Sequence, residues 1–202
     1  WKKNFKFLRH LVFLFRVLSL VRRADGILAL NAVSAGVPTA LAARFARKPF
    51  AVRIVGDYAW ETAVNSGATH LLINDFQKAP RRGKSKLLHR LQVWTARKAQ
   101  AVIVPSEYLA DIVRGWGIEP EKIKVVYNGV DFKPVVMPHD QARRQIGISG
   151  NIILSVGRLV PWKGFRMLVK IMPQLLQINQ FFRLVIIGDG PDEKMLKMII
   201  KN

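Results

Sequence analysis

Two cations in one short loop, Arg158 and Lys163, have the residue types and spacing best suited to binding a charged ligand. They lie between an apolar run and a helix-like segment that begins near Gly164, and Gly157 would let the backbone turn at the start of the loop. The planar donors of an arginine and the compact charge of a lysine together suit a diphosphate. The amino terminus of the following helix would add unpaired N–H groups. The alternative is that both cations are solvated charges beside a turn.

The segments around this loop predict a β–α–β unit. Asn151–Val156 and Phe182–Ile187 are apolar runs typical of buried strands in a parallel sheet, and residues 165–179 carry apolar side chains at helical spacing. Such units are right-handed, so both strands end at the same sheet edge, where open α/β sheets bind ligands. We therefore expect Gly188 and Gly190, which follow the second strand, to lie beside the Arg158–Lys163 loop and to form a nucleotide site with it.

These two loops resemble those of a known family. Ser155-Val-Gly-Arg-Leu-Val-Pro-Trp-Lys-Gly164, followed by Val185-Ile-Ile-Gly-Asp-Gly-Pro191, is similar to the second domain of family 4 retaining glycosyltransferases. Residues 101–109 and 122–132 are similar to the end of that family's first domain and to its linker. The resemblance implies an α/β protein of the GT-B type, with two Rossmann-like domains and parallel sheets.

The same resemblance implies a function. Members transfer a sugar from a nucleotide-sugar donor to an acceptor hydroxyl with retention of configuration, here in the synthesis of a cell-surface polysaccharide or a glycolipid. Arg158 and Lys163 would bind the donor diphosphate, and Gly157, Gly188 and Gly190 would lie by the donor. No metal is expected, and the nucleotide-sugar is a substrate rather than a cofactor.

Two parts of the family pattern are not found in this chain. Members open with a strand and a glycine-rich loop, whereas this sequence starts at Trp1 within a helix-like segment. They also carry a pair of glutamates after this β–α–β unit, and no acidic pair after Glu193 can take that role. We therefore expect a fragment cut at both ends and inactive alone, with its catalytic glutamates beyond Asn202.

The domain boundaries follow from alternating strand and helix patterns. We predict an acceptor-side Rossmann-like domain at residues 1–131 without its first strand, a linker at 132–140 that contains two prolines, and the start of a nucleotide-sugar-binding domain at 141–202. In the first domain the patterns predict strands at 25–30, 50–55, 101–104 and 123–127, helices at 35–47 and 107–115, and a basic loop at 77–85. Ser106 is expected to cap the helix at 107–115. Residues 67–75 have no clear pattern.

Asp57 and Trp60 are the acceptor-side candidates. They follow the strand at 50–55, in a loop that faces the acceptor in the family, and many members have a histidine there that this chain lacks. We predict that Asp57 orients an acceptor hydroxyl, and Trp60 could stack on a sugar face. The alternatives are that Asp57 caps the next helix and that Trp60 packs in the core.

The net charge of +20 is uneven: residues 1–100 carry +15 and residues 101–202 carry +5. The segments at 1–23 and 78–98 combine basic residues with apolar residues at helical spacing, which is typical of helices that lie on membranes. An anionic membrane surface and a sugar or lipid-linked acceptor are therefore candidate partners, and we expect a cytoplasmic protein that is peripheral at the inner membrane face. The alternative is sheet-covering helices with solvated basic faces. The apolar stretch at 11–20 is too short to span a bilayer.

Other classes of protein fit the sequence less well. The chain has no cysteine and its four histidines lack ligand spacing, so neither disulfides nor a metal site are predicted. A nucleic-acid-binding protein would explain the charge, but aromatic residues are not interleaved with the basic ones, and no nucleic-acid partner is expected. A dehydrogenase would need a Gly-x-Gly-x-x-Gly motif after a strand, which is absent. A non-catalytic nucleotide- or sugar-binding module remains the alternative.

Overall fold

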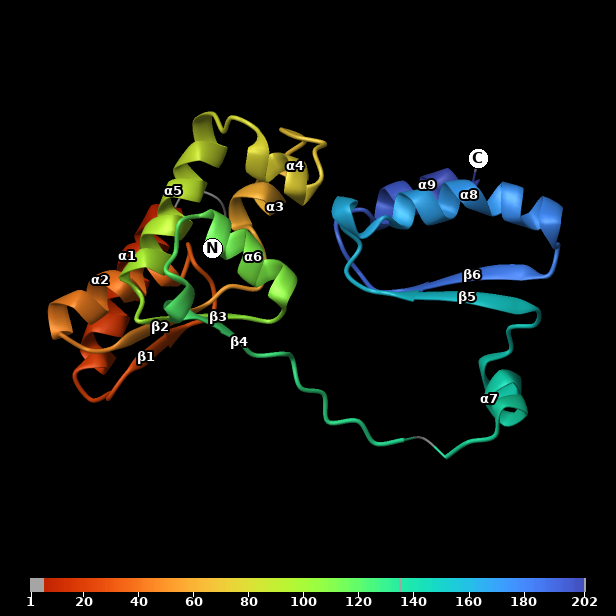
Figure 1. The fold of residues 1–202 in the computed structure, drawn as a ribbon. Helices are drawn as coiled ribbons and strands as arrows, with labels where there is room; N and C mark the ends of the chain where they lie inside the picture. The colour runs from red at the N-terminus through yellow and green to blue at the C-terminus, as the bar shows by residue number, and fades with distance from the viewer. Residues whose placement is uncertain (1–5, 135, 202) are drawn as a thin grey trace. The chain divides into compact units, whose positions relative to one another are not determined.

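The computed structural model describes residues 6–134 and 136–201, and the chain divides into two compact units at residues 1–130 and 131–202 (Figure 1). Each unit is built on a parallel sheet, so the predicted α/β class is confirmed. The predicted linker at 132–140 includes residue 135, which lies outside the described residues, and its last two residues begin helix α7 (His139–Ile146). Lys2, Lys3 and Asn202 also lie outside the described residues.

The first unit contains a four-stranded parallel sheet whose strands are neighbours in chain order. The strands are β1 (Ile27–Ala29), β2 (Phe50–Arg53), β3 (Ala101–Val104) and β4 (Ile123–Val125). Because right-handed connections in this order place all the crossover helices on one face, α2, α5 and α6 lie on the same side of the sheet (Figure 1). In β3, Val102 and Val104 are buried in the core, while Ala101 and Ile103 are partly exposed.

Six α-helices are described in this unit: α1 (Lys6–Val21), α2 (Gly36–Ala46), α3 (Tyr58–Asn65), α4 (Ile73–Lys78), α5 (Gly83–Lys98) and α6 (Glu107–Gly115). A 3-10 turn at Pro120–Lys122 precedes β4. The basic loop predicted at 77–85 is wrong, because α4 and α5 leave only residues 79–82 outside helices. Helix α4 was not indicated by sequence patterns, and it is anchored by its own residue Phe76, whose side chain is buried.

The second unit contains β5 (Asn151–Val156) and β6 (Phe182–Ile187), paired in parallel from Asn151↔Phe182 to Val156↔Ile187. A 3-10 turn at Pro161–Lys163 leads into α8 (Phe165–Ile178), and α9 (Glu193–Lys201) follows β6. Both helices cover the same side of the strand pair (Figure 1), which confirms the predicted β–α–β unit. The prediction that its strands are buried is wrong on the other face, where Val156 is 69% exposed.

The amino-terminal helix α1 is amphipathic and basic, as expected. Its Val21 is buried, whereas Phe15 and Leu20 are exposed together with Arg16. None of the helices in residues 6–134 and 136–201 has both the length and the apolar character needed to cross a bilayer. Association of α1 with a membrane surface stays a prediction.

Candidate functional site

The loops that follow β5 and β6 are joined by backbone hydrogen bonds, which confirms that they lie side by side. The N–H of Gly157 donates to the carbonyl of Ile187 at 2.9 Å, and the N–H of Leu159 donates to that of Asp189 at 2.7 Å. The N–H of Asp192 then donates back to the carbonyl of Leu159 at 3.1 Å. The ladder of the two strands thus continues into their loops, and the path of one loop determines the path of the other.

The glycines of the second loop make this approach possible. Gly188 and Gly190 have φ angles of 152° and 154°, which L-residues with side chains rarely adopt. A Cβ on Gly188 would lie 2.9 Å from the carbonyl carbon of Gly157, and one on Gly190 would lie 2.8 Å from the nitrogen of Leu159. Both glycines are therefore required for packing between the loops, and their place beside a donor stays a prediction.

Gly157 is different from these two glycines. Its φ is not positive, and a Cβ there would be in ordinary contact with Phe165 at 3.5 Å. The sharp turn expected at Gly157 occurs instead at Gly164, whose φ of 76° separates the 3-10 turn from α8. Gly157 contributes its N–H to the ladder rather than a special backbone conformation.

Arg158 and Lys163 are both exposed in this loop, and within the described residues neither forms a hydrogen bond or an ion pair with another side chain. Between them, the buried side chains of Leu159 and Val160 fix the loop to the core, so the cations extend from an anchored backbone. The first turn of α8 contains no acidic residue. Two available cations beside a helix amino terminus can bind a diphosphate.

An ion pair that the sequence analysis did not predict lies next to the Arg158–Lys163 loop. Arg166, in the first turn of α8, donates from Nε and Nη2 to the two carboxylate oxygens of Asp192, at 3.0 and 3.1 Å. Asp192 is buried and directly precedes α9, so the pair joins the starts of the two helices. Its only local signal was an aspartate at a position typical of helix caps.

Asp57 lies in a different environment from the one predicted. Its side chain is fully buried, and its Oδ1 accepts from the backbone N–H of Trp60 at 3.1 Å, which is the helix cap considered as an alternative. Oδ1 also accepts from Gln92 at 2.9 Å, and Oδ2 accepts from Gln77 at 2.8 Å. No exposed carboxylate atom is left to contact an acceptor directly. An acceptor-side role of Asp57 through the side chains that it holds stays a prediction.

Trp60 is part of the core of the first unit rather than an open sugar platform. It is 9% exposed, and its indole Nε1 donates to the carbonyl of Leu71 at 2.9 Å. Packing of this ring, the alternative considered for it, explains why residues 67–72 follow a defined path without regular secondary structure. The stacking of Trp60 on an acceptor sugar would require this packing to open.

A pocket in the first unit was not predicted at all. It has a volume of about 410 Å³ and lies between α4, α5 and α6, with a lining that includes Asn74, Gln77, Lys78, Arg81, His89 and Trp116. Burial and the nearby Arg81 guanidinium lower the pKa of His89, although Asp57 opposes the shift. Within the described residues, no group of three or more histidines and carboxylates could hold a metal ion. The absence of a metal from the reaction remains an expectation.

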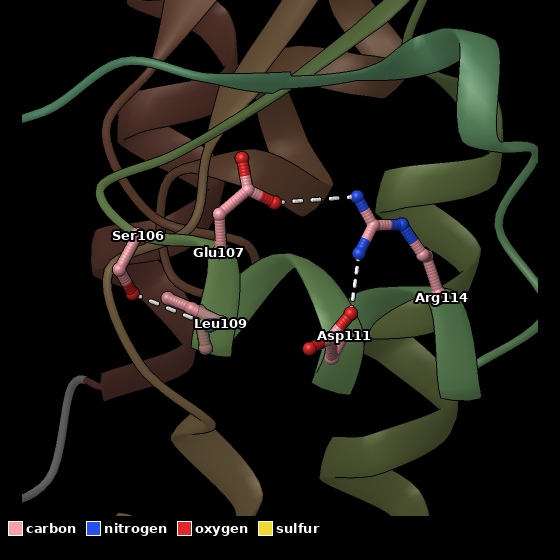
Figure 2. A network of polar contacts seen from close by, with 5 residues as sticks. All are labelled: Ser106, Glu107, Leu109, Asp111 and Arg114. Carbon is pink, nitrogen blue, oxygen red and sulfur yellow. Dashed lines mark hydrogen bonds and ion pairs between the residues drawn. The ribbon is translucent and has the colours of Figure 1, made fainter.

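The amino terminus of α6 follows the prediction. The N–H of Leu109 donates to Oγ of Ser106 at 3.2 Å, so Ser106 caps the helix as expected (Figure 2). Farther along the helix, Arg114 lies between the carboxylates of Glu107 and Asp111 and pairs with both (Figure 2). Asp111 also lines the pocket.

Two family models match this chain, one over each part of it. Residues 1–133 match the family described as Glycosyltransferase Family 4, and residues 138–202 match the one described as Glycosyl transferases group 1. The N-acetylgalactosamine-N,N'-diacetylbacillosaminyl-diphospho-undecaprenol 4-alpha-N-acetylgalactosaminyltransferase of Campylobacter jejuni is 31% identical over 93 residues, which are 46% of this chain and 24% of that enzyme. The D-inositol 3-phosphate glycosyltransferase of Corynebacterium efficiens is 34% identical over 92 residues, 42% of this chain and 22% of that enzyme.

Among solved structures, the chain is similar to Anabaena Alr3699/HepE, crystallised in complex with UDP and glucose and also with UDP-glucose. For the UDP and glucose complex the TM-score is 0.70 at 22% identity, over 99% of this chain and 50% of that one. This likeness shows a common fold, and the chain spans about half the length of that protein.

Proposed function

The chain belongs to the family 4 glycosyltransferases, and on that premise we propose that the whole protein transfers a sugar from a nucleotide-sugar donor to an acceptor hydroxyl with retention of configuration. The observation that carries the proposal is the anchored loop that holds Arg158 and Lys163 beside the start of α8. In the reaction, the bond from the anomeric carbon to the diphosphate oxygen breaks, and a bond to the acceptor oxygen forms as that hydroxyl loses its proton.

Arg158 and Lys163 would act on the leaving group. As the glycosidic bond to the diphosphate breaks, negative charge grows on the phosphate oxygen, and preorganised cations stabilise such charge more than they stabilise the ground state. Gly188 and Gly190 would keep the two loops close together, and Gly157, which joins them through its N–H, would lie by the donor. The solved Anabaena protein binds UDP and UDP-glucose, which supports a uridine diphosphate sugar as the first donor to test.

For the acceptor, we propose a sugar or a lipid-linked sugar that carries negative charge. The net charge of +15 on residues 1–100 favours an anionic partner, and the names of two relatives contain a diphospho-undecaprenol and an inositol 3-phosphate. The exposed apolar and basic side chains of α1 support a position at the anionic inner face of a membrane. We expect the reaction to need no resident cofactor.

The test is turnover of the whole protein with a panel of nucleotide-sugars and a membrane lipid extract as the source of acceptors. We expect release of nucleoside diphosphate that depends on acceptor, with a product whose anomeric configuration, read from its proton NMR coupling, equals that of the donor. Inversion would contradict the proposed stereochemistry. Binding of nucleotide-sugar without turnover under all acceptors would favour the non-catalytic binding module instead.

A further inference from the structure

The pocket between α4, α5 and α6 is lined by residues of the first unit alone, and neither Arg158 nor Lys163 is among them. Its volume of about 410 Å³ lies within the roughly 300–1,000 Å³ usual for small-molecule sites. The proposed function assigns no ligand to it, and the chemistry of its lining indicates which class of ligand fits.

The lining has an excess of positive charge. Lys78 and Arg81 contribute two cations, and the described residues give Lys78 no ion-pair partner. The carboxylate of Asp111 is already paired with Arg114 on the same helix (Figure 2). The lining thus contains two cations against one acidic residue, Asp111, and this excess of positive charge favours an anion.

Arg81 is held in place before any ligand arrives. Its Nη2 donates to Oε1 of Gln77 at 2.9 Å, and its guanidinium lies over the ring of Phe76, 5.4 Å from the ring centre. Its Nε is buried and has no hydrogen-bond partner among residues 6–134 and 136–201. The guanidinium is therefore oriented by its neighbours, and as part of the pocket lining it can donate to an oxygen of a ligand there.

Gln77 is in turn fixed by three groups. Its amide Nε2 donates to Oδ2 of Asp57, and its Oε1 accepts from the indole Nε1 of Trp116 at 3.1 Å as well as from Arg81. The buried carboxylate of Asp57 thus sets the orientation of the Gln77 amide, and with it the position of Arg81. In this arrangement Asp57 is a positioning residue that acts through Gln77.

We propose that this pocket binds the phosphate monoester group of a phosphorylated sugar or polyol, with Arg81 and Lys78 on the phosphate. Arginine and lysine are common partners of phosphate oxygens. The exposed Tyr108 side chain, whose hydroxyl donates to Asn74 at 2.8 Å, offers a ring and polar groups for the rest of such a ligand, next to the buried Trp116. That the ligand is the acceptor rests on the proposed function, whereas the phosphate site itself does not.

The test is titration of the whole protein with glycerol 3-phosphate, and separately with vesicles that contain phosphatidic acid, so that a soluble and a lipid source of the same group are compared. The readout is the indole N–H resonance of Trp116, identified by its loss in Trp116→Phe. We expect a saturable shift with at least one source, and at least a tenfold weaker affinity in Arg81→Met and in Lys78→Met. Arg82→Met is the matched control, because Arg82 is exposed and does not line the pocket, and it should bind like the parent.

Two further variants separate the pocket from the donor site. Arg158→Ala with Lys163→Ala should leave the Trp116 shift intact, and binding of UDP should survive in Arg81→Met. If the proposed donor site were wrong, the parent would not bind UDP, but the Trp116 shift would still be observed. Absence of a Trp116 shift with both sources, or equal weakening in Arg81→Met and Arg82→Met, would overturn the proposal.

Discussion

The Cα of Gly188 packs against the carbonyl group of Gly157 so closely that there is no room for a Cβ at position 188. This contact joins the loop that carries Arg158 to the loop after β6, and three backbone hydrogen bonds continue it up to Asp192. A long loop with two charged side chains would otherwise lose conformational freedom only when it bound a ligand. Here the backbone of the loop is ordered by its neighbour beforehand.

Gly188→Ala should therefore disrupt the second unit, whereas Gly157→Ala should not. The alanine at 188 would have to adopt an unfavourable φ and would overlap backbone atoms, so we expect a loss of at least about 1–3 kcal/mol in the free energy of unfolding. The alanine at 157 would make only an ordinary contact with Phe165. Urea denaturation of both variants measures the difference. Equal stability of the two would show that the loops do not pack as described.

Arg166→Ala should destabilise the protein more than Lys197→Ala does. Removal of Arg166 leaves the carboxylate of Asp192, which is 8% exposed, without its two charged donors, at an expected loss of roughly 1–3 kcal/mol. Lys197 pairs with Glu193 on the surface of α9, and such exposed pairs contribute little to stability because water screens them. Thermal unfolding of the two variants beside the parent checks the order. A larger effect of Lys197→Ala would contradict the role given to the buried pair.

Asp57→Ala should lower the stability of the first unit by roughly 1–3 kcal/mol, because the amides of Gln77 and Gln92 and the N–H of Trp60 all lose their acceptor. Asp25→Ala is a suitable control, since Asp25 is exposed and outside any helix, and such changes stay within about 0.5 kcal/mol. Chemical denaturation gives both values. Equal stability of Asp57→Ala and Asp25→Ala would show that the buried hydrogen bonds of Asp57 do not contribute the stability assigned to them.

His89 should make stability depend on pH in the acidic range. Burial, with a further effect of Arg81, holds the pKa of His89 below its ordinary value of 6.5, so the unfolded chain takes up a proton at a higher pH than the folded protein does. The stability that the neutral ring contributes is complete above pH 6.5 and is lost as the pH falls through the folded-state pKa.

We therefore expect the melting temperature of the parent to fall more steeply between pH 7.5 and pH 5.5, values on either side of the histidine range of about 6.5, than that of His89→Gln. His70→Gln, which removes an exposed histidine, should keep the slope of the parent. Parallel curves for the parent and His89→Gln would show that His89 does not carry this dependence.

Local signals predicted the elements around the Arg158–Lys163 loop and two elements of the first unit. β3, β5, β6 and α6 match their predicted bounds, and α8 ends one residue earlier, because apolar runs and helical spacing between glycines, prolines and Ser106 determine them locally. The helix α4 was not predicted. It has only six residues and no side-chain cap, and it is held by the buried Phe76. That contact depends on the fold around it.

The contacts of Asp57 also divide into a local one that the sequence could predict and distant ones that it could not. Its cap on α3 is a local interaction and could be anticipated, whereas its contacts with Gln77 and Gln92 connect positions 20 and 35 residues away. The pocket depends on such distant contacts, including the one between Gln77 and Trp116, 39 residues apart. For Gly188 and Gly190 the residue type was visible in the sequence, but the backbone that they pack against was not.

The most direct test is calorimetric titration of UDP into the whole protein, its Arg158→Ala and Lys163→Ala variants, and a Lys170→Ala control that removes an exposed cation of α8 away from the loop. We expect each loop variant to lose about 1.5–3 kcal/mol of binding free energy, the usual value for a hydrogen bond to a charged group, and Lys170→Ala to bind like the parent. Equal affinity of all four proteins, or an equal loss in all three variants, would contradict a donor site built on Arg158 and Lys163.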